Sequence, residues 1–231
     1  MVNTFETIKA MYEESFRLHG DSPASLLTPK GRSELRFRSI NPFLGGRKVR
    51  VLDYGCGLGY LYDYLGQTGH DVDYTGVDIL PSFIQACRDK YSTTAATFHL
   101  VEPEAKIDGE FDVVFSSGVF NLITHQDETL SKAYAFSRIQ QLCELTNEVL
   151  ICDFLSPFVD FKQDQAQHFE MDEVARFCSS QLTRRFVLRH DLLPYEFTLI
   201  AYRQEDIKRP ENCFSVDFET DRSVPNAGGS L

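Results

Sequence analysis

Apolar residues recur along the chain with two different periods, which predict helices and strands in turn. Between Phe5 and Phe16 the spacing is helical, so a helix is predicted over about 4–18. The same spacing predicts further helices over about 33–40, 58–67, 127–145 and 170–182, and Pro81 is well suited to open another. Residues 157–168 do not follow this pattern and are predicted to form a loop.

Short runs rich in β-branched and aromatic residues lie between these helices and predict strands. The runs cover about 49–54, 72–78, 96–101, 148–154, 185–190 and 197–202, with one more starting at Phe111. The last two are joined by a turn predicted around Asp191 to Pro194. Strands that alternate with helices are typical of α/β proteins, and these elements predict a seven-stranded sheet with helices on both faces.

The segment Val51 to Leu61 combines a buried strand, a glycine-rich turn and the first turn of a helix. Gly55, Gly57 and Gly59 remove every second Cβ atom from the turn, which permits positive φ angles and lets a ligand approach the backbone. The N–H groups of a helix opening at about Leu58 would face the same place. A carboxylate follows at the end of the next strand, where it can accept hydrogen bonds from both hydroxyls of a ribose. The sequence therefore predicts a site for a ligand that contains adenosine.

The spacing of the glycines distinguishes between cofactors. In the dinucleotide pattern G-x-G-x-x-G the third glycine comes one residue later than here, where Tyr60 stands. The run from Val51 through Asp53 to Gly59 instead resembles motif I of the class I S-adenosylmethionine-dependent methyltransferases, (V/L)-L-D-x-G-x-G-x-G, and Asp78 matches the acid of that family's second strand. The resemblance spans roughly residues 45–203 and implies S-adenosyl-L-methionine as the cofactor.

The family resemblance also implies an architecture: a doubly wound, mostly parallel sheet with an antiparallel last strand. Segments before the first strand often cover the cofactor in this family, so residues 1–44 are interpreted as an N-terminal helical cap of the same domain. Residues 45–203 form the methyltransferase domain in this division. The polar stretch 204–231 is predicted to be a flexible tail.

Further cofactor-binding residues are assigned through the same resemblance. Ile79 follows the ribose acid, and Ser117 belongs to the loop from Ser116 to Asn121, which in this family lies beside the reacting methyl group. Glu102 stands where many members place an acid that binds the adenine amino group, although Glu104 competes with it for this role.

A basic stretch over residues 30–50 precedes the first strand and contains a single acid, Glu34. It is read first as a solvated helix with its flanks. The alternative is that part of the stretch binds an anion, either the cofactor carboxylate or the substrate. Arg36 is included among the cofactor-binding residues for this reason, and Tyr12 and Lys30 are further candidates in the same region.

Methyl transfer from a sulfonium is a direct displacement, so the protein mainly aligns the nucleophile, and a hydroxyl nucleophile would usually need a base. His125 is the first candidate for this base, because it follows the loop after the fourth strand. His168 and His190 are alternatives, and each of the three can also be an ordinary surface or strand histidine. Tyr60 and Phe120 are expected either to pack on the cofactor or simply to fill space.

Composition and missing motifs limit the class of methyl acceptor and the cellular compartment that the sequence predicts. The net charge of −11 and the lack of N/D-P-P-Y/F and Pro-Cys motifs make nucleic acid an unlikely acceptor and favour a small molecule, with protein substrates left open. No apolar run is long enough for a membrane span, and no signal peptide is evident. The six cysteines are scattered without a C-x-x-C pair, which indicates reduced thiols in a cytoplasmic protein rather than a zinc site or disulfide framework. The sequence does not indicate an oligomeric state.

Two other classes of function are weighed against a methyltransferase. An NAD-linked oxidoreductase shares the open sheet and the ribose acid, and is disfavoured by the early third glycine. A catalytically inactive subunit could keep the cofactor fold for contact with a partner, although the intact glycines and Asp78 count against it.

Overall fold

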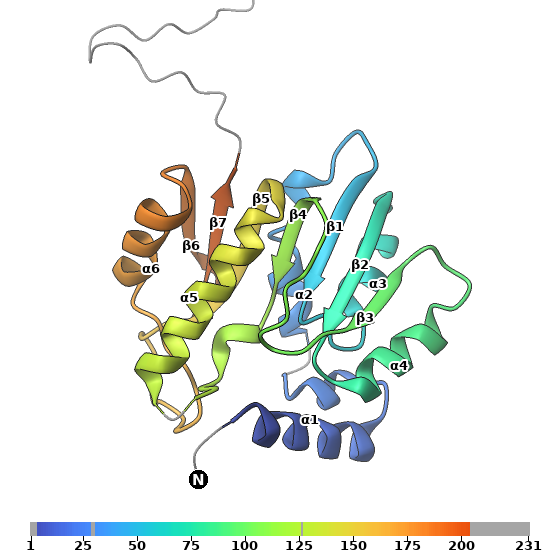
Figure 1. Cartoon of the computed structure of the whole chain (residues 1–231), viewed down its shortest axis with the longest axis horizontal. Coiled ribbons are helices and arrows are strands. Elements are labelled where there is room, and N and C mark those ends of the chain that lie inside the picture. Colours follow the sequence, from blue (N-terminus) through green and yellow to red (C-terminus); the bar gives the residue numbers. More distant parts are fainter. Residues whose placement is uncertain (1–3, 29–30, 126, 204–231) are drawn as a thin grey trace, which may run out of the picture.

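Seven strands form one continuous sheet in the computed structural model, which describes residues 4–28, 31–125 and 127–203 (Figure 1). The order across the sheet is β3-β2-β1-β4-β5-β7-β6. The strands are β1 (Val49–Tyr54), β2 (Val72–Asp78), β3 (Thr97–Leu100), β4 (Phe111–Ser116), β5 (Thr146–Leu155), β6 (Phe186–Leu193) and β7 (Glu196–Tyr202). The predicted tail, 204–231, lies outside the described residues.

The first five strands are parallel, whereas β7 runs antiparallel to both β5 and β6. This arrangement confirms the predicted fold class: a doubly wound, mostly parallel sheet that closes on an antiparallel strand. The arrowheads in Figure 1 place the carboxyl ends of β2 and β4 at the same edge of the sheet. In sheets of this kind, ligands bind outside the carboxyl ends of the parallel strands.

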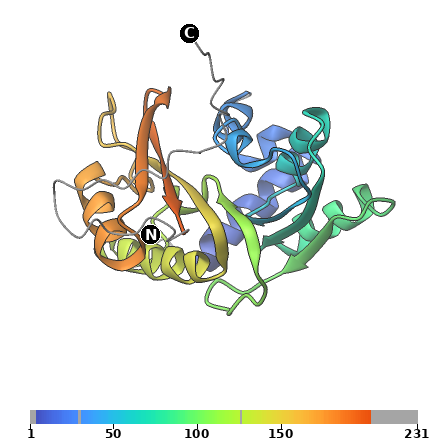
Figure 2. The same cartoon turned by 90° about the horizontal axis from the view of Figure 1, so that it is seen from above.

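Both faces of the sheet are covered, which explains why the central strands bury apolar residues on both faces. In β1, Val49 and Val51 enter one hydrophobic core, while Leu52 and Tyr54 enter the core on the other face. The first core is completed by α2 (Arg32–Phe37), α3 (Tyr60–Gln67) and α4 (Pro81–Lys90), and the second by α5 (Glu128–Glu144) and α6 (Met171–Phe177). Figure 2 shows α5 and α3 on opposite sides of the sheet.

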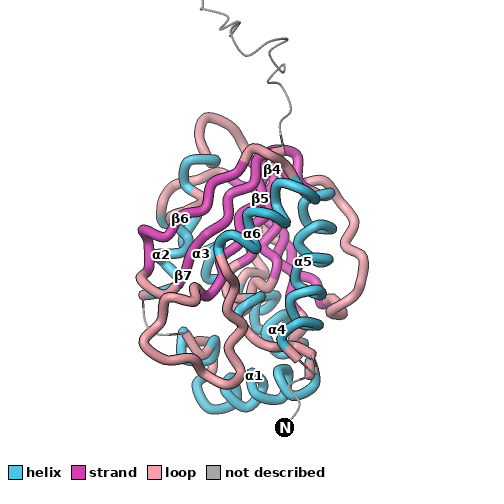
Figure 3. The backbone as a smooth tube through the Cα atoms, turned by 90° about the vertical axis from the view of Figure 1, so that its left-hand side faces the viewer, coloured by secondary structure: helices cyan, strands magenta, loops and turns pink. Residues whose placement is uncertain are grey.

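The N-terminal helix α1 (Phe5–His19) lies across the carboxyl-end edge of the sheet, as Figures 1 and 3 both show. Its first turn is capped by Thr4, whose hydroxyl accepts a hydrogen bond from the N–H of Thr7. Two short 3₁₀ turns follow, η1 (Pro23–Leu26) and η2 (Asn41–Phe43), on either side of α2. The segments before β1 therefore cover the edge at which a ligand would bind.

Several predicted element boundaries differ from the structure by a few residues, and two of the differences also change the secondary-structure assignment. The turn expected around Asp191 is wrong, because β6 continues to Leu193 and the reversal is made by Pro194 and Tyr195. The pairing with β7 shifts register between Arg189 and Leu193, which accommodates the extra strand length. The helix predicted to end near 182 holds its α geometry only to Phe177 and then widens into a π turn, Cys178–Leu182. Within the part of the chain that the structure describes, no helix is long and apolar enough to cross a membrane.

Candidate active site

The glycine-rich turn between β1 and α3 forms the floor of the candidate site. Gly55, Gly57 and Gly59 all have positive φ angles, of 80°, 54° and 74°. A Cβ on Gly55 would overlap Cγ2 of Val119, and one on Gly57 would lie 2.8 Å from Cδ2 of Leu26. Glycine is required here because both the backbone conformation and the close neighbours exclude a side chain.

Backbone hydrogen bonds fix this turn against the neighbouring strand. The carbonyl of Val77 accepts hydrogen bonds from the N–H groups of Gly55 and Cys56, at 2.8 and 3.0 Å. These bonds bring the end of β2 alongside the turn, so that Asp78 faces the glycines. Sequence-distant parts of the predicted nucleoside site are thereby brought together.

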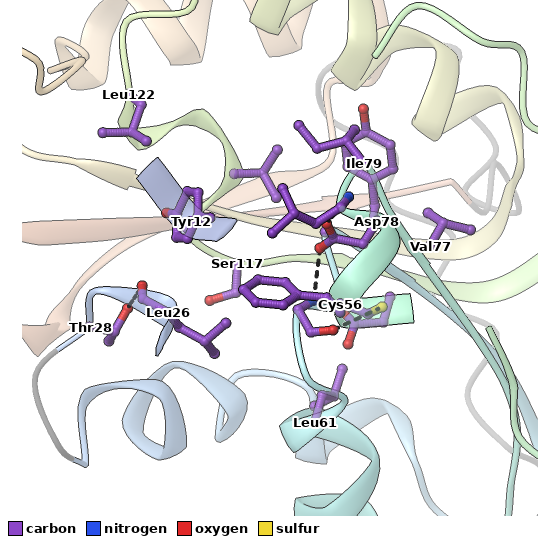
Figure 4. Close-up of a pocket in the computed structure, with 18 of the residues that line it drawn as sticks. Tyr12, Leu26, Thr28, Cys56, Leu61, Val77, Asp78, Ile79, Ser117 and Leu122 are labelled. Carbon is purple, nitrogen blue, oxygen red and sulfur yellow. Dashed lines mark hydrogen bonds between the residues drawn. The ribbon is translucent and has the colours of Figure 1, made fainter. Parts of the chain in front are cut away.

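A cavity of about 180 Å³ opens above the turn (Figure 4). Its wall includes most of the residues predicted to bind the cofactor: Arg36, Asp53, Gly55, Gly57, Asp78, Ile79 and Ser117. The cap contributes the opposite wall through Phe5, Ile8, Tyr12, Leu26, Thr28 and Ser33. The lining is mainly apolar and aromatic with a few convergent polar groups, which is typical of a small-molecule site.

Asp78 combines burial with backbone hydrogen bonds. Oδ2 accepts from the N–H of Gly57 and Oδ1 from the N–H of Leu80, both at 2.9 Å. Burial raises the pKa of Asp78, and these N–H donors only partly offset that rise. An ionised carboxylate has about four acceptor positions. The hydrogen bonds from Gly57 and Leu80 therefore leave acceptor capacity on Asp78 for a hydroxyl donor.

Asp53 lies beneath the cavity at the end of β1, in a more isolated setting. Its Oδ2 accepts a hydrogen bond of 2.5 Å from the hydroxyl of Tyr74. Burial is the main cause that raises the pKa of Asp53 to about 7; the Tyr74 bond opposes the rise and the charge of Asp78 adds to it. This carboxyl group therefore changes its charge near neutral pH.

Arg36 belongs to a buried ionic cluster at the edge of the cavity. Its Nε and Nη2 donate to the two carboxylate oxygens of Glu196, at 2.6 and 2.7 Å. Asp153 lies 3.7 Å from Nε, and Arg32 forms an ion pair of 3.2 Å with Glu196. Burial by itself lowers the pKa of Arg36, but the carboxylates of Asp153 and Glu196 overcome this and hold the pKa above its ordinary value.

Tyr12 reaches the cavity from α1 and packs edge-on against Phe83, with ring centroids 6.2 Å apart. Burial raises its pKa to about 12, a rise to which the charge of Asp78 adds and which that of Arg36 opposes. The phenol of Tyr12 is therefore a neutral hydroxyl that interacts electrostatically with both Asp78 and Arg36. Lys30, the other candidate named from this region, lies outside the described residues.

Two of the residues assigned to the cofactor, Gly59 and Glu102, do not line the cavity. Gly59 is the N-cap residue of α3, and a Cβ there would lie 2.6 Å from the ring of Tyr91. Glu102 is 71% exposed and forms a 3.2 Å ion pair with Lys9 of α1; Glu104 is also exposed, and only the preceding Val101 reaches the cavity.

His125 lies one residue beyond the cavity wall. Its Nδ1 is 2.8 Å from the hydroxyl of Thr124, which does line the cavity, and its ring contacts those of Phe5 and Tyr134. His168 is buried and pairs with the carbonyl of Ser156, at 2.7 Å, away from the cavity wall. His190 also stands outside the wall, with its ring near that of Phe158.

Of the two aromatic candidates, only Tyr60 lines the cavity. Tyr60 lines the cavity and donates a hydrogen bond to Asp21 at 2.9 Å, whereas Phe120 is buried in the core between Tyr54 and Phe154. Sequence analysis missed Glu196 and Asp153 altogether. An acid inside the apolar run of β5 was the available signal for Asp153, but no local pattern marked its link to Arg36.

These residues fit an S-adenosylmethionine cofactor. The turn without side chains leaves room for the nucleoside, Asp78 can accept from ribose hydroxyls, and Arg36 places a cation in the wall of the same cavity. The sheet order and the site together define a class I, Rossmann-like S-adenosylmethionine-dependent methyltransferase.

Comparison with known proteins supports this class at the level of sequence. A family model described as a methyltransferase domain matches residues 46–187. The chain belongs to this methyltransferase domain family. It is an S-adenosylmethionine-dependent enzyme, which the resemblance of the glycine-rich turn to motif I predicts.

Individual relatives agree on the class and differ in their acceptors. The "Putative methyltransferase Rv1506c" of Mycobacterium tuberculosis is 29% identical over 153 residues, which cover 65% of this chain and 91% of that protein. A tRNA U34 carboxymethyltransferase of Pseudomonas fluorescens is 36% identical over 98 residues, covering 38% of this chain and 29% of the relative. The magnesium protoporphyrin IX methyltransferase of Synechocystis, solved with bound SAH, has a TM-score of 0.60 at 19% identity, covering 84% of this chain and 94% of that one.

Proposed function

We propose that this enzyme transfers the methyl group of S-adenosylmethionine to a small-molecule acceptor by direct displacement. The observation that carries the proposal is the cavity itself, which is enclosed by the cap and lined mainly by apolar and aromatic groups. Charged groups in the wall are limited to Arg36, Asp53 and Asp78, among the described residues. Since all three have a proposed role toward the cofactor, the acceptor would meet a largely uncharged surface.

Each charged group is assigned to one part of the cofactor. Asp78 accepts hydrogen bonds from the ribose hydroxyls, Arg36 binds the carboxylate, and Asp53 in its ionised form attracts the ammonium group. Ile79 and Ser117 are proposed to contact the adenine and the methionine ends, and Gly55 and Gly57 to admit the backbone contact. The bound cofactor supplies the electrophilic methyl group, so the chain binds, orients and excludes water.

The base, if the acceptor needs one, is proposed to be His125 acting through Thr124. The hydroxyl of Thr124 lines the cavity and lies 2.8 Å from Nδ1 of His125, so it could accept a proton from an acceptor while passing its own to the ring. Glu102 and Gly59 stay in the cofactor proposal in weaker positions: Glu102 as an acid at the rim, and Gly59 as the residue that permits the start of α3.

The division of the chain and its compartment are also proposals. Residues 1–44 would act as a cap on the domain 45–203, since α1 and α2 both contribute to the cavity wall. A cytoplasmic location is supported by the cysteines of the described residues, all five of which are free and buried.

Calorimetric titration with S-adenosylmethionine, S-adenosylhomocysteine and NAD tests the class of cofactor. We expect the first two to bind and NAD not to bind. Tight binding of NAD alone would overturn the proposal. A screen of metabolite extracts for transfer of a labelled methyl group then tests the acceptor, and labelling of RNA rather than of small molecules would favour the nucleic-acid alternative that the tRNA-modifying relative represents.

A further inference from the structure

Glu196, the first residue of β7, is buried next to the cavity without lining it. Its side chain is only 3% exposed. Both of its carboxylate oxygens are bound by Arg36, which is 160 positions away in the sequence. A buried bidentate pair of this kind fixes the plane of the guanidinium as well as its position.

The pairing leaves one edge of Arg36 available. Glu196 takes Nε and Nη2, whereas Nη1 has no hydrogen-bond partner among the residues that the structure describes. Nη1 lies 3.2 Å from the position that a Cβ on Gly118 would occupy, and both Arg36 and Gly118 line the cavity. Because the group is planar, holding one edge on Glu196 directs the other toward the loop after β4.

A competing carboxylate shows why the position of Arg36 needs to be held. Asp153 is 3.7 Å from Nε, and its Oδ1 already accepts the N–H of Gly118 at 2.8 Å. A shift of the guanidinium toward Asp153 would move Nη1 relative to Gly118. Arg32 and Arg36 together balance the charges of Glu196 and Asp153, so the cluster has no net positive charge and could attract an anion only through directed N–H groups.

We propose that Glu196 is a positioning residue: it holds Arg36 so that Nη1 donates to the carboxylate of the cofactor's amino-acid end. The inference rests on the proposed function and adds to it a residue from the far end of the chain. It also explains why a buried acid begins this strand, whose residues from Glu196 to Ala201 are all buried.

The test compares two ligands that share a nucleoside. S-adenosylhomocysteine carries the amino-acid end, whereas 5′-methylthioadenosine lacks it. In Glu196→Gln we expect calorimetry to show roughly tenfold weaker binding of the first ligand and unchanged binding of the second. Arg36→Lys should show the same selective loss. The double variant should bind no more weakly than Arg36→Lys alone, because both changes remove one interaction.

Glu148→Gln is the matched control, since Glu148 also pairs with an arginine, Arg47, but at the opposite end of the sheet. It should bind both ligands as the wild type does. Equal weakening of both ligands by Glu196→Gln would make Glu196 a structural residue, and unchanged or tighter binding of S-adenosylhomocysteine would also overturn the inference.

Two further outcomes separate this inference from the proposed function. If the wild-type chain binds neither ligand, both proposals fail together; if it binds both and Glu196→Gln matches it, only the role of Glu196 fails. Should Glu196→Gln not fold, Glu196→Asp provides the same test, because it keeps the charge while shortening the side chain. We expect that variant to show the same selective loss, and a wild-type profile would contradict the positioning role.

Discussion

The two ends of the sheet carry similar ionic clusters in very different surroundings. At the amino end, Asp112 of β4 accepts from Arg47 and Arg50 at 3.0 and 2.9 Å, and Arg47 also pairs with Glu148. At the carboxyl end, Arg36 pairs with Glu196 and lies near Asp153. The arginine side chains at the amino end are 45% and 44% exposed, whereas that of Arg36 is 9% exposed.

This difference in exposure changes what each cluster contributes. Exposed pairs contribute about 0–1 kcal/mol to stability, because water and salt screen them. Removing charges from water costs roughly several kcal/mol per ion, so a buried ion pair adds little net stability. Stability alone therefore does not explain why charged residues lie beside the cavity. The amino-end cluster only joins exposed arginines to carboxylates, whereas the carboxyl-end cluster holds Arg36 in a position from which it can bind a ligand.

The largest contrast is expected between two glycines with nearly the same backbone angle. Gly55 (φ 80°) contacts Val119 at the cavity, whereas Gly69 (φ 75°), just before β2 at the amino end, has open space around it. Gly69→Ala should cost only backbone strain, about 1–2 kcal/mol. Gly55→Ala should cost about 3 kcal/mol or more, because overpacking adds to the strain.

Binding separates these two variants further. Gly55→Ala should lower affinity for S-adenosylhomocysteine about 100-fold, which corresponds to roughly 3 kcal/mol. Gly69→Ala should bind as the wild type does. Thermal unfolding and calorimetry measure both effects, and equal affinities in the two variants would remove the glycine turn from the proposed site.

The second contrast compares a carboxylate at the carboxyl end of the sheet, Asp78, with one at the amino end, Asp112. Asp78→Asn removes the charge that would receive the ribose hydroxyls, and charge-assisted hydrogen bonds contribute about 1.5–3 kcal/mol. We therefore expect affinity for S-adenosylhomocysteine to fall about 10- to 100-fold. Asp112→Asn should lower the unfolding temperature without changing affinity. Unaltered affinity in Asp78→Asn would contradict the ribose assignment.

The last contrast is a pH dependence with opposite signs at the two ends. Burial raises the pKa of Asp53 to about 7 from an ordinary value of 3.8, so the folded state binds the proton more tightly than the unfolded state. Stability from this group is present at low pH and is lost as the pH rises through about 7. For Asp112, burial would raise the pKa, but hydrogen bonds from Arg50 and Arg47 hold it well below the ordinary value, so its contribution is lost only as the pH falls below about 4.

Ligand affinity should increase as Asp53 loses its proton near pH 7, whereas the stability from this group decreases over the same range. If ionised Asp53 attracts the cofactor ammonium as proposed, affinity for S-adenosylhomocysteine should be about tenfold weaker at pH 6 than at pH 8. In Asp53→Asn this dependence should flatten, apart from the part that belongs to Asp78, whose pKa burial also raises. The variant should also unfold at a higher temperature than the wild type at pH 8. A steep pH dependence that survives in Asp53→Asn would assign the titration to another group.

Local patterns predicted most of the fold and the sheet side of the cavity. The strands β1 and β2 were predicted with the bounds that the structure has, since both runs are rich in β-branched and aromatic residues. The turn predicted near Asp191 was wrong because the polar residues there continue along an edge strand, whose outer side has no partner strand among the described residues.

The sequence by itself determined the end of the cavity that is proposed to hold the nucleoside: a turn that needs Gly55 and Gly57 and an acid one strand away both follow from short-range geometry. Only the tertiary structure decided the other wall, where Leu26 lies over Gly57 and Glu196 holds Arg36. Backbone angles and strand ends depend on neighbouring residues, and so they leave a local signature. An ion pair across 160 positions depends on how the cap and the last hairpin pack together, and no stretch of the chain contains that information alone.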